Sequence, residues 1–318
     1  MTGIRVEAPA RLHFGMLDLG AELGRRFGGI GVAIARPSVV LEAYPQEELT
    51  AEGPDAERAL RFARQYLRTT GVQGGAHLYV ERTIPAHVGL GSGTKLGLAV
   101  AWALAGLYGH PDDVYTLAQR VGRGERSAVG LWTFARGGFV VEGGRRLGSS
   151  SPAPLLMRYP MPAGWRCVVA VPHGYAGLSG SEEAAAFDRL VSSPHLAARI
   201  AHVVLMALLP ALVEGEIAEF GAALTRVQQL VGESFSSVQG GRFANARSAE
   251  LIRAFLNWGA AGAGQSSWGP AVYALVADEE QGRDLAARAR DFLAGTGTVE
   301  LVAFDNQGAQ MSLIEGRQ

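Results

Sequence analysis

Alternating apolar and polar positions predict several strands in the first half of the chain. Residues 4–8 alternate in this way and lead into a mostly apolar segment, 9–18, which we also expect to lie in a sheet. The predicted strands cover residues 4–8, 32–35, 39–43, 77–82 and 137–142. We therefore expect the first half to be rich in strands.

Three segments of the first half have helical spacing instead. Residues 56–69 place apolar side chains on one side, which predicts a partly exposed helix. Residues 94–108 are apolar almost all round, so this helix should be buried. Asp113 is suited to cap a third helix that continues to about Arg120.

Helical patterns dominate the second half. The predicted helices cover 182–190, 195–209, 217–231, 248–258 and 279–293, and the predicted strands cover 165–171, 271–277 and 298–304. Between the halves, the serine- and proline-rich segment 145–162 is the best candidate for a linker. Because 318 residues exceed the usual size of one domain, we expect an α+β fold with two domains, 1–160 and 161–318.

Composition and charge narrow the classes of function. Hydrophobic residues make up 48% and charged residues 19% of the chain, which is typical of a compact soluble protein. The net charge of −1 gives no broad basic surface, so we expect no nucleic-acid partner and a local site for any anion. With one cysteine and no uninterrupted apolar run of membrane-spanning length, we expect a cytoplasmic protein without disulfides, cysteine-based zinc sites or membrane contacts.

The candidate chemistry begins at the turn 85–94, PAHVGLGSGT, between a predicted strand and the buried helix. Glycines let backbone N–H groups converge there, and the start of the helix adds its dipole. The spacing matches neither the Walker motif nor the dinucleotide fingerprint. The turn alone is therefore either a phosphate site or a tight turn for close helix packing.

Three segments together resemble the ordered motifs of the GHMP kinase superfamily. They are residues 9–15 (PARLHFG), 85–93 (PAHVGLGSG) and 262–275 (GAGQSSWGPAVYAL). The resemblance implies a two-lobed fold, with an N-terminal lobe like ribosomal protein S5 and a helix-rich, ferredoxin-like C-terminal lobe. However, the family's catalytic aspartate in P-S-G-x-D corresponds here to Gly130 of RSAVG, which cannot accept a proton.

A closer resemblance is to the β-ribofuranosylaminobenzene 5′-phosphate synthase family, which shares the fold of the kinases. The similar segments are 11–20, 84–93, 122–127, 137–144, 177–180, 238–243 and 265–270. The resemblance implies that phosphoribosyl pyrophosphate (PRPP) reacts with an aromatic carboxylic acid to form a C–C bond with release of CO2 and pyrophosphate. The acceptor is left open, between 4-hydroxybenzoate or 4-aminobenzoate for a methanopterin-type cofactor and a pyrazole-type acid for a C-nucleoside antibiotic. It also implies a homodimer.

Site residues follow from these motifs. The residues expected to bind PRPP are Gly89, Gly91, Ser92, Gly93, Thr94, Lys95, Arg123, Arg242, Ser266 and Ser267. The expected catalytic residues, which would orient the acceptor carboxylate or stack on its ring, are Arg11, His13, Arg126 and Trp268. Asp18 and Glu125 are the candidate ligands of Mg²⁺, which we expect to bridge the pyrophosphate oxygens. The sequence leaves open whether Lys95 projects into solvent, His13 is a core residue and Trp268 only packs between lobes.

Two other functions remain open at this point. One is an ATP-dependent kinase of the same superfamily that uses another carboxylate in place of the absent aspartate. The other is a non-catalytic protein that binds a nucleotide or another metabolite.

Overall fold

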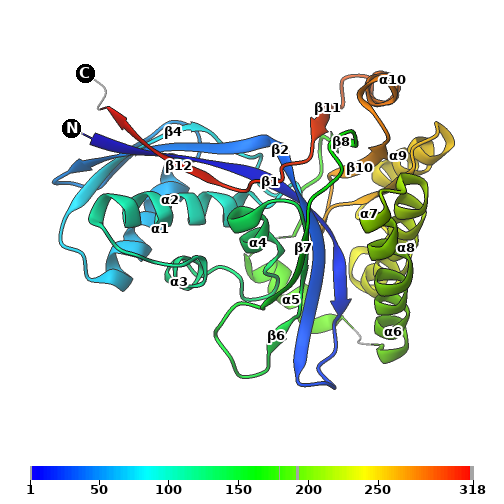
Figure 1. The fold of residues 1–318 in the computed structure, drawn as a ribbon, viewed down its shortest axis with the longest axis horizontal. Helices are drawn as coiled ribbons and strands as arrows, with labels where there is room; N and C mark the ends of the chain where they lie inside the picture. Colours follow the sequence, from blue (N-terminus) through cyan, green and yellow to red (C-terminus); the bar gives the residue numbers. More distant parts are fainter. Residues whose placement is uncertain (1, 179, 191–192, 316–318) are drawn as a thin grey trace.

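The computed structural model describes residues 2–178, 180–190 and 193–315. Ser179, which belongs to the 177–180 motif, lies outside the described residues. Among these residues the chain forms two sheets with helices packed against them (Figure 1). The expected two-lobed α+β arrangement is confirmed.

The first sheet is built on two long antiparallel strands, β1 (Thr2–Asp18) and β2 (Arg25–Gln46). Its order is β12-β1-β2-β4-β3, and β5, β6 and β7 attach to the same assembly through β2 and β5. The other strands are β3 (Thr50–Glu52), β4 (Gly75–Arg82), β5 (Phe139–Glu142), β6 (Arg145–Arg146), β7 (Leu155–Tyr159) and β12 (Gln310–Glu315). The sequence pattern predicted parts of β1 and β2 and most of β4 and β5, but not β3, β6, β7 or β12.

Helices α1, α2 and α4 pack on one side of this sheet, and α3 packs against these three helices (Figure 1). Their bounds are α1 (Ala56–Thr70), α2 (Ser92–Tyr108), α3 (Val114–Arg120) and α4 (Val129–Arg136). The helix α2 is buried along most of its length, as its apolar sequence predicted. Asp113 caps α3 as expected, because its side chain accepts a hydrogen bond from the backbone N–H of Thr116 at 2.8 Å.

The second sheet has the order β11-β8-β10-β9 and is antiparallel throughout. Its strands are β8 (Arg166–Pro172), β9 (Gly262–Gln265), β10 (Val272–Val276) and β11 (Gly297–Ala303). The accompanying helices are α5 (Gly180–Arg189), α6 (Pro194–Val203), the π-helical turn η1 (Val204–Leu208), α7 (Leu209–Glu214), α8 (Ile217–Gln239), α9 (Ala246–Asn257) and α10 (Glu279–Leu293). The expected helices and strands of this half are all present.

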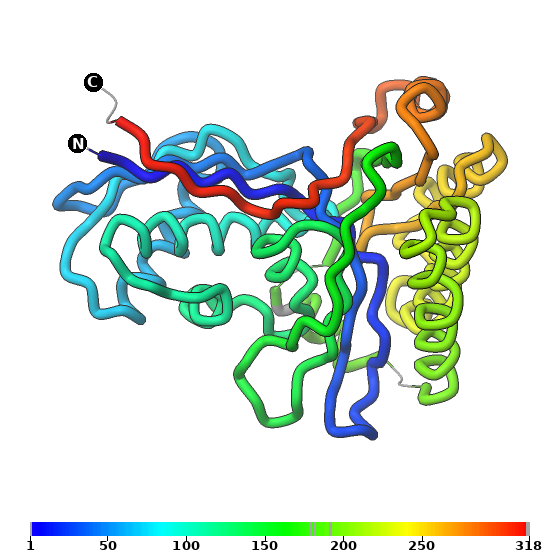
Figure 2. The backbone as a smooth tube through the Cα atoms, in the orientation of Figure 1, coloured from blue at the N-terminus to red at the C-terminus, as the bar shows by residue number. Residues whose placement is uncertain are grey.

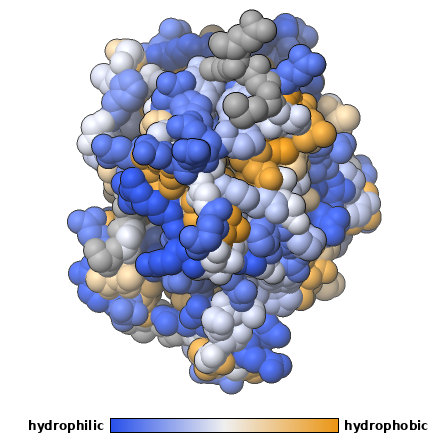
Figure 3. Space-filling model, turned by 90° about the vertical axis from the view of Figure 1, so that its left-hand side faces the viewer, coloured by the Kyte–Doolittle hydropathy of each residue, from blue (hydrophilic) through white to orange (hydrophobic). Residues whose placement is uncertain are grey.

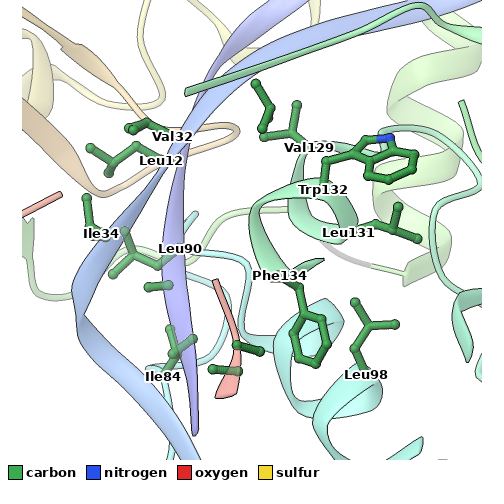
Figure 4. Close-up of a cluster of buried hydrophobic side chains, with 14 of the residues drawn as sticks. Leu12, Val32, Ile34, Ile84, Leu90, Leu98, Val129, Leu131, Trp132 and Phe134 are labelled. Atoms are coloured by element: carbon green, nitrogen blue, oxygen red, sulfur yellow. The ribbon is translucent and has the colours of Figure 1, made fainter. Parts of the chain in front are cut away.

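One hydrophobic cluster extends through both lobes, and the second sheet forms a further cluster of its own with α9 and α10. Side chains from β1, β2, α2 and α4 face one another around Leu12, Val32, Leu98 and Phe134 (Figure 4). This cluster continues into the second lobe, where the rings of Phe14 and Tyr273 lie 4.9 Å apart between their centroids. Figure 3 shows that the end of the molecule carrying both termini is, by contrast, mostly hydrophilic.

The segment 145–162 is not a linker, contrary to our expectation. It contains β6 and β7, which pair with β2 and β5 of the first sheet. The end of the chain also returns to the first sheet, because β12 pairs with β1 from Thr2↔Glu315 to Glu7↔Gln310 (Figure 2). The second half is therefore not a separate contiguous unit.

The helical run Pro194–Glu214 is long and apolar enough to cross a membrane, by length and composition. The sequence alone predicted no membrane span here, because polar residues such as Arg199 and His202 interrupt the apolar run. One such helix is weak evidence for a membrane span, since core helices share this composition. Here the run packs along α8 (Figure 1), with 28% of its most apolar window buried. A cytoplasmic location and a homodimer stay predictions.

Candidate active site

The glycine-rich turn brings backbone N–H groups to the start of α2. Gly89 and Gly91 have φ values of +88° and +84°, which glycine adopts without strain. A Cβ at Gly89 would lie 2.3 Å from the carbonyl oxygen of Ser266, so the turn leaves no space for a side chain there. No capping side chain or acidic residue occupies the first turn of α2. The helix dipole and the N–H groups therefore favour an anion at this point.

Five arginines surround this turn and form a cleft of about 430 Å³, which we call the arginine cleft. They are Arg11, Arg58, Arg61, Arg123 and Arg126. Glu183 is the only acid among the described residues that line the cleft. Burial lowers the pKa of Arg11 to about 10, which leaves it charged at neutral pH. The arginine cleft therefore carries an excess of positive charge.

Arg123 is held in place without using all of its donors. Its guanidinium lies over the ring of Phe62, 4.8 Å from the centroid. Its Nε atom is buried and has no hydrogen-bond partner among the described residues. A buried donor without a partner costs about 1–3 kcal/mol. A Cβ on Gly93 would lie 3.3 Å from Arg58 Nη2 and 3.4 Å from Arg123 Nη2, so both cations flank the first turn of α2.

Most of the predicted site residues, donor-binding and catalytic together, meet in the arginine cleft. Those that line it are Arg11, Gly89, Gly91, Ser92, Gly93, Thr94, Arg123, Arg126, Ser267 and Trp268. Arg58 and Arg61 of α1 were not predicted, although arginines recur along that helix at positions 58, 61, 64 and 68. That recurrence was the available signal for a basic helix face.

Lys95 does not reach the cleft, contrary to the prediction. Its side chain is completely buried, and its Nζ donates a hydrogen bond to Thr133 Oγ1 at 2.9 Å. Burial holds the pKa of Lys95 well below its ordinary value. The open alternative, projection into solvent, is also wrong, because the residue points into the core between α2 and α4.

Ser266 is a buried structural residue rather than a donor ligand. Its Oγ donates to the carbonyl oxygen of Gly89 at 2.6 Å and accepts from the backbone N–H of His13 at 2.9 Å. The next residue, Ser267, donates its backbone N–H to the carbonyl oxygen of His13 at 3.1 Å. These bonds fasten the loop after β9 to both β1 and the glycine-rich turn.

A narrow second cavity, of about 40 Å³, lies beside the arginine cleft, and we call it the aromatic cavity. Its walls include Met16, Phe187, Phe235, Phe243 and Trp268, with His13, Gln228, Gln239, Arg242, Gln265 and Ser267 as polar members. The ring of Trp268 lies 4.7 Å from that of Phe235, centroid to centroid, and its Nε1 donates to Glu183 at 3.1 Å. Trp268 is a wall of the cavity and also belongs to a buried cluster with Met16 of β1 and Phe27 of β2, so it contacts the first lobe as well.

Arg242 lies in the aromatic cavity and not in the arginine cleft, where we had expected it. It is the only charged side chain among the described residues that line this cavity. Its guanidinium is about half exposed, and Glu233 lies 3.9 Å away. Arg242 is therefore placed to contact an anionic group at the rim of the aromatic cavity.

His13 lines the aromatic cavity, but both of its ring nitrogens are already engaged. Nδ1 accepts from the backbone N–H of Gly15 at 3.2 Å, which places the proton on Nε2, 2.9 Å from Ser127 Oγ. Burial lowers the pKa of His13 to about 3, so the ring is neutral. The predicted contact of His13 with a carboxylate is therefore not supported, and the residue forms part of a wall.

Ser127 connects this histidine to a buried carboxyl group that the sequence analysis missed. The Ser127 hydroxyl hydrogen-bonds Glu142, which also accepts from the backbone N–H groups of Ala128 at 3.2 Å and Gly144 at 2.8 Å. Burial raises the pKa of Glu142 to about 7. Glu142 follows an ordinary strand pattern, and nothing in its local sequence marks it as buried.

The candidate metal ligands do not come together. Asp18 accepts a hydrogen bond from the backbone N–H of Gly20 at 2.7 Å and lines neither cavity, and Glu125 lines a different cavity. The described residues contain no group of three acidic, histidine or cysteine side chains suited to a metal ion. Glu183 is in the arginine cleft but is paired with Arg126 at 2.7 Å. The residues present therefore do not fit a dedicated metal site.

Gly130 confirms that no carboxylate stands where the kinase motif has its aspartate. It lies in the first turn of α4, and a Cβ at this position would be 3.1 Å from Cγ2 of Thr94. The space beside the glycine-rich turn is therefore filled by Thr94.

The arginine cleft and the aromatic cavity share two wall residues, Ser267 and Trp268. Both follow β9, and the bonds of Ser266 hold this loop against the turn. An anionic ligand and an aromatic ligand bound in the two spaces would meet at this shared wall.

Comparisons with known proteins agree with this arrangement. A model described as GHMP kinases N terminal domain matches residues 56–137, and one described as GHMP kinases C terminal matches residues 208–295. The β-ribofuranosylphenol 5′-phosphate synthase of Methanothermobacter thermautotrophicus is 33% identical to this chain, over 96% of this chain and 98% of the relative. The β-ribofuranosylphenol 5′-phosphate synthase of Archaeoglobus fulgidus is 34% identical, over 92% of this chain and 94% of the relative.

Solved structures show the same fold at lower identity. The homoserine kinase from Cytophaga hutchinsonii has a TM-score of 0.72 at 18% identity, covering 98% of this chain and 97% of its own. L. major mevalonate kinase has a TM-score of 0.68 at 16% identity, covering 94% of this chain and 95% of its own. These matches confirm the expected GHMP-kinase-like fold.

Proposed function

Because this chain belongs to the β-ribofuranosylphenol 5′-phosphate synthase family, a family of enzymes with the GHMP kinase fold, we propose that it is a PRPP-dependent C-glycosyltransferase. In the proposed reaction, ribose 5-phosphate is joined to an aromatic or heteroaromatic carboxylic acid with loss of CO2 and pyrophosphate. The observation that carries the proposal is the contact between the arginine cleft and the aromatic cavity at Ser267 and Trp268.

The arginine cleft is suited to the donor. Pyrophosphate leaves with the electron pair of the C1–O bond, so its departure is favoured by donors that are already aimed at its oxygens. The start of α2, Arg58 and Arg123 surround one point, and Arg123 Nε still has a free proton. Charge-assisted hydrogen bonds to oxyanions are about twice as strong as neutral ones.

The apolar walls of the aromatic cavity are suited to one side of the acceptor ring, since a volume of about 40 Å³ does not enclose a whole benzoate. The ring carbon that bears the carboxylate forms the new bond to C1 of the ribose, and the bond from that carbon to the carboxylate then breaks. Its electron pair restores the aromatic ring as CO2 leaves, so no proton has to be removed by the protein. His13 and an apolar wall fit this chemistry, because the Nδ1 lone pair of His13 already accepts from the backbone N–H of Gly15 and the apolar side chains limit the access of water to the sugar cation.

Mg²⁺ enters this proposal only as a counterion that the pyrophosphate brings with it. Magnesium commonly binds through substrate phosphates with one or two carboxylates from the protein. Since Asp18 and Glu125 lie outside the arginine cleft, we assign them no ligand role.

The acceptor we favour first is 4-hydroxybenzoate, because the relatives are named for a ribofuranosylphenol. Its hydroxyl group is para to the carboxylate and enriches the attacking carbon in electrons. 4-Aminobenzoate has the same electronic pattern, and a pyrazole carboxylate is a smaller ring for the same cavity. The name does not decide among pathways, and the C-nucleoside route stays a second proposal.

An ATP-dependent kinase would need another carboxylate in the cleft, and Glu183, the one acid among the described residues that line it, is paired with Arg126 at 2.7 Å. The absence of a carboxylate at Gly130 counts against an ATP-dependent kinase. A non-catalytic binding protein has no need of a second cavity in contact with the anion site.

The proposal is tested by incubating the protein with PRPP and a panel of aromatic and heteroaromatic acids, with and without Mg²⁺. We expect pyrophosphate and CO2 to appear together in equal amounts with at least one acid. Release of neither product across the panel would refute the proposal. Release of ADP from ATP with sugar or alcohol acceptors would support the kinase instead.

A further inference from the structure

Four arginines face one another across the short ladder between β2 and β6. The register pairs Arg25 with Arg146 and Arg26 with Arg145. Like charges directly opposite each other destabilise a pair of strands. Arg25 and Arg26 donate to backbone carbonyl groups of Gly144 and Leu19, at 2.9 and 3.0 Å. Within the described residues, no carboxylate lies at ion-pair distance from any of the four.

Three of these arginines line a cavity of about 260 Å³ together with Arg126, and we call it the ladder cavity. Its four guanidinium groups are Arg26, Arg126, Arg145 and Arg146, and its acidic members are Glu125 and Asp188. Four positive and two negative side chains leave a formal charge of +2 on the walls. Guanidinium groups match the geometry of phosphate oxygens in two-pronged contacts. The ladder cavity therefore has the charge and the donors for a phosphate dianion.

The position of the ladder cavity relates it to the other two spaces. Arg126 lines both the ladder cavity and the arginine cleft. Phe187 lines both the ladder cavity and the aromatic cavity. The three spaces thus meet in pairs around Arg126, Phe187 and Trp268. The phosphoribosyl donor likewise carries a charged group at each end of its ribose, the 5-phosphate at one end and the pyrophosphate on C1 at the other.

We propose that the ladder cavity is the subsite for a phosphomonoester dianion, the 5-phosphate of the phosphoribosyl donor. This assignment rests on the proposed function, in which the pyrophosphate on C1 occupies the arginine cleft and the acceptor ring the aromatic cavity. With the 5-phosphate in the ladder cavity, C1 of the ribose is directed to the wall shared by the other two spaces. The bound dianion also offsets the repulsion within the arginine ladder, so that ligand binding stabilises the fold.

The test uses the Arg145→Gln and Arg146→Gln variants, each of which removes one charge from the ladder cavity. Arg25→Gln is the matched control, because Arg25 belongs to the same ladder but does not line the cavity. Calorimetric titration measures the Kd of four probes: PRPP, ribose 5-phosphate, inorganic phosphate and inorganic pyrophosphate. Thermal unfolding with and without ribose 5-phosphate gives a second readout.

We expect both cavity variants to bind ribose 5-phosphate and PRPP about tenfold more weakly, the effect of losing one charge-assisted contact. Pyrophosphate binding should stay unchanged, and Arg25→Gln should bind all probes like the unmodified protein. The rise in Tm caused by ribose 5-phosphate should shrink in the two cavity variants only.

Each other outcome has a definite meaning. Unchanged Kd values for ribose 5-phosphate and PRPP in both cavity variants would overturn the subsite while leaving the proposed function intact. If PRPP does not bind the unmodified protein but ribose 5-phosphate binds and is lost in Arg145→Gln, the proposed function fails and the phosphomonoester site stands. Equal affinity for inorganic phosphate and ribose 5-phosphate would overturn the assignment to the donor in favour of a site for free phosphate.

Discussion

Replacing Gly91 by alanine tests whether the glycine-rich turn is an anion site or only a tight turn. Gly91 has a φ of +84° and is the N-cap of α2. A residue with a side chain pays about 1–2 kcal/mol for this left-handed conformation. The new Cβ would also lie 3.1 Å from Cγ of Arg11, whose buried guanidinium donates to the carbonyl oxygen of Gly89. The substitution therefore moves both the first N–H groups of α2 and one arginine of the cleft.

Gly71 is a matched control for this change. It has a φ of +71° at the end of α1, and a Cβ there would meet nothing within 4 Å. Gly71→Ala therefore carries the conformational cost alone, about 1–2 kcal/mol. We expect urea unfolding to show a loss of this size in both variants.

Only Gly91→Ala should lose affinity for inorganic pyrophosphate. The loss of one charge-assisted hydrogen bond costs about 1.5–3 kcal/mol, so the Kd should rise about tenfold or more. Calorimetric titration of both variants and the unmodified protein measures this directly. Equal pyrophosphate affinity in Gly91→Ala and Gly71→Ala would show that the turn serves packing alone.

Three further predictions concern the walls and the buried groups. Trp268→Ala should raise the KM for the aromatic acid about tenfold, and Trp268→Phe should raise it less because a ring remains; equal kinetic effects would contradict stacking. Burial raises the pKa of Glu142 from 4.5 to about 7. Between pH 4.5 and 7, Glu142 therefore keeps its proton in the folded protein and loses it in the unfolded chain. The stability of the unmodified protein relative to Glu142→Gln should therefore fall by about 3 kcal/mol from pH 4.5 to 7, as urea unfolding at several pH values will show; a constant difference would refute this. Burial lowers the pKa of His13 to about 3, so His13 makes the stability fall as the pH drops below 6.5, the opposite direction. This contribution cancels in the comparison because both proteins contain His13. Gly130→Asp should release no ADP from ATP, because a Cβ at this position already lies 3.1 Å from Cγ2 of Thr94 and leaves little room for a carboxylate; ADP release by the unmodified protein would revive the kinase.

Local sequence patterns predicted those elements whose apolar or capping residues match the burial and contacts that the fold gives them. The all-round apolar segment 94–108 became the buried helix α2, and Asp113 capped α3 as its position indicated. The edge strand β12 was not predicted because its side chains are mostly half-buried or exposed, which leaves a weak apolar pattern. Pairing between β12 and β1 joins residues some 300 positions apart, and local periodicity carries no trace of such pairing.

The site was predicted to the extent that motifs mark it. The glycine-rich turn and Trp268 were found through their sequence segments, whereas Arg58 reaches the cleft from a separate helix that only the tertiary fold brings near. Lys95 was placed wrongly, because a lysine is rarely buried without a charged partner. Glu142 was missed because its burial depends on the Ser127 hydroxyl and on backbone donors from other loops.

Formation of a C–C bond with loss of the carboxylate can be followed with an acceptor labelled by ¹³C in its carboxyl group. The protein is incubated with PRPP and labelled 4-hydroxybenzoate, 4-aminobenzoate or a pyrazole carboxylate, and the products are followed by NMR and mass spectrometry. We expect all of the label consumed to appear as CO2, in a one-to-one ratio with pyrophosphate, and the ribosylated ring to carry none. A ribosylated product that retains the labelled carboxyl group would contradict it.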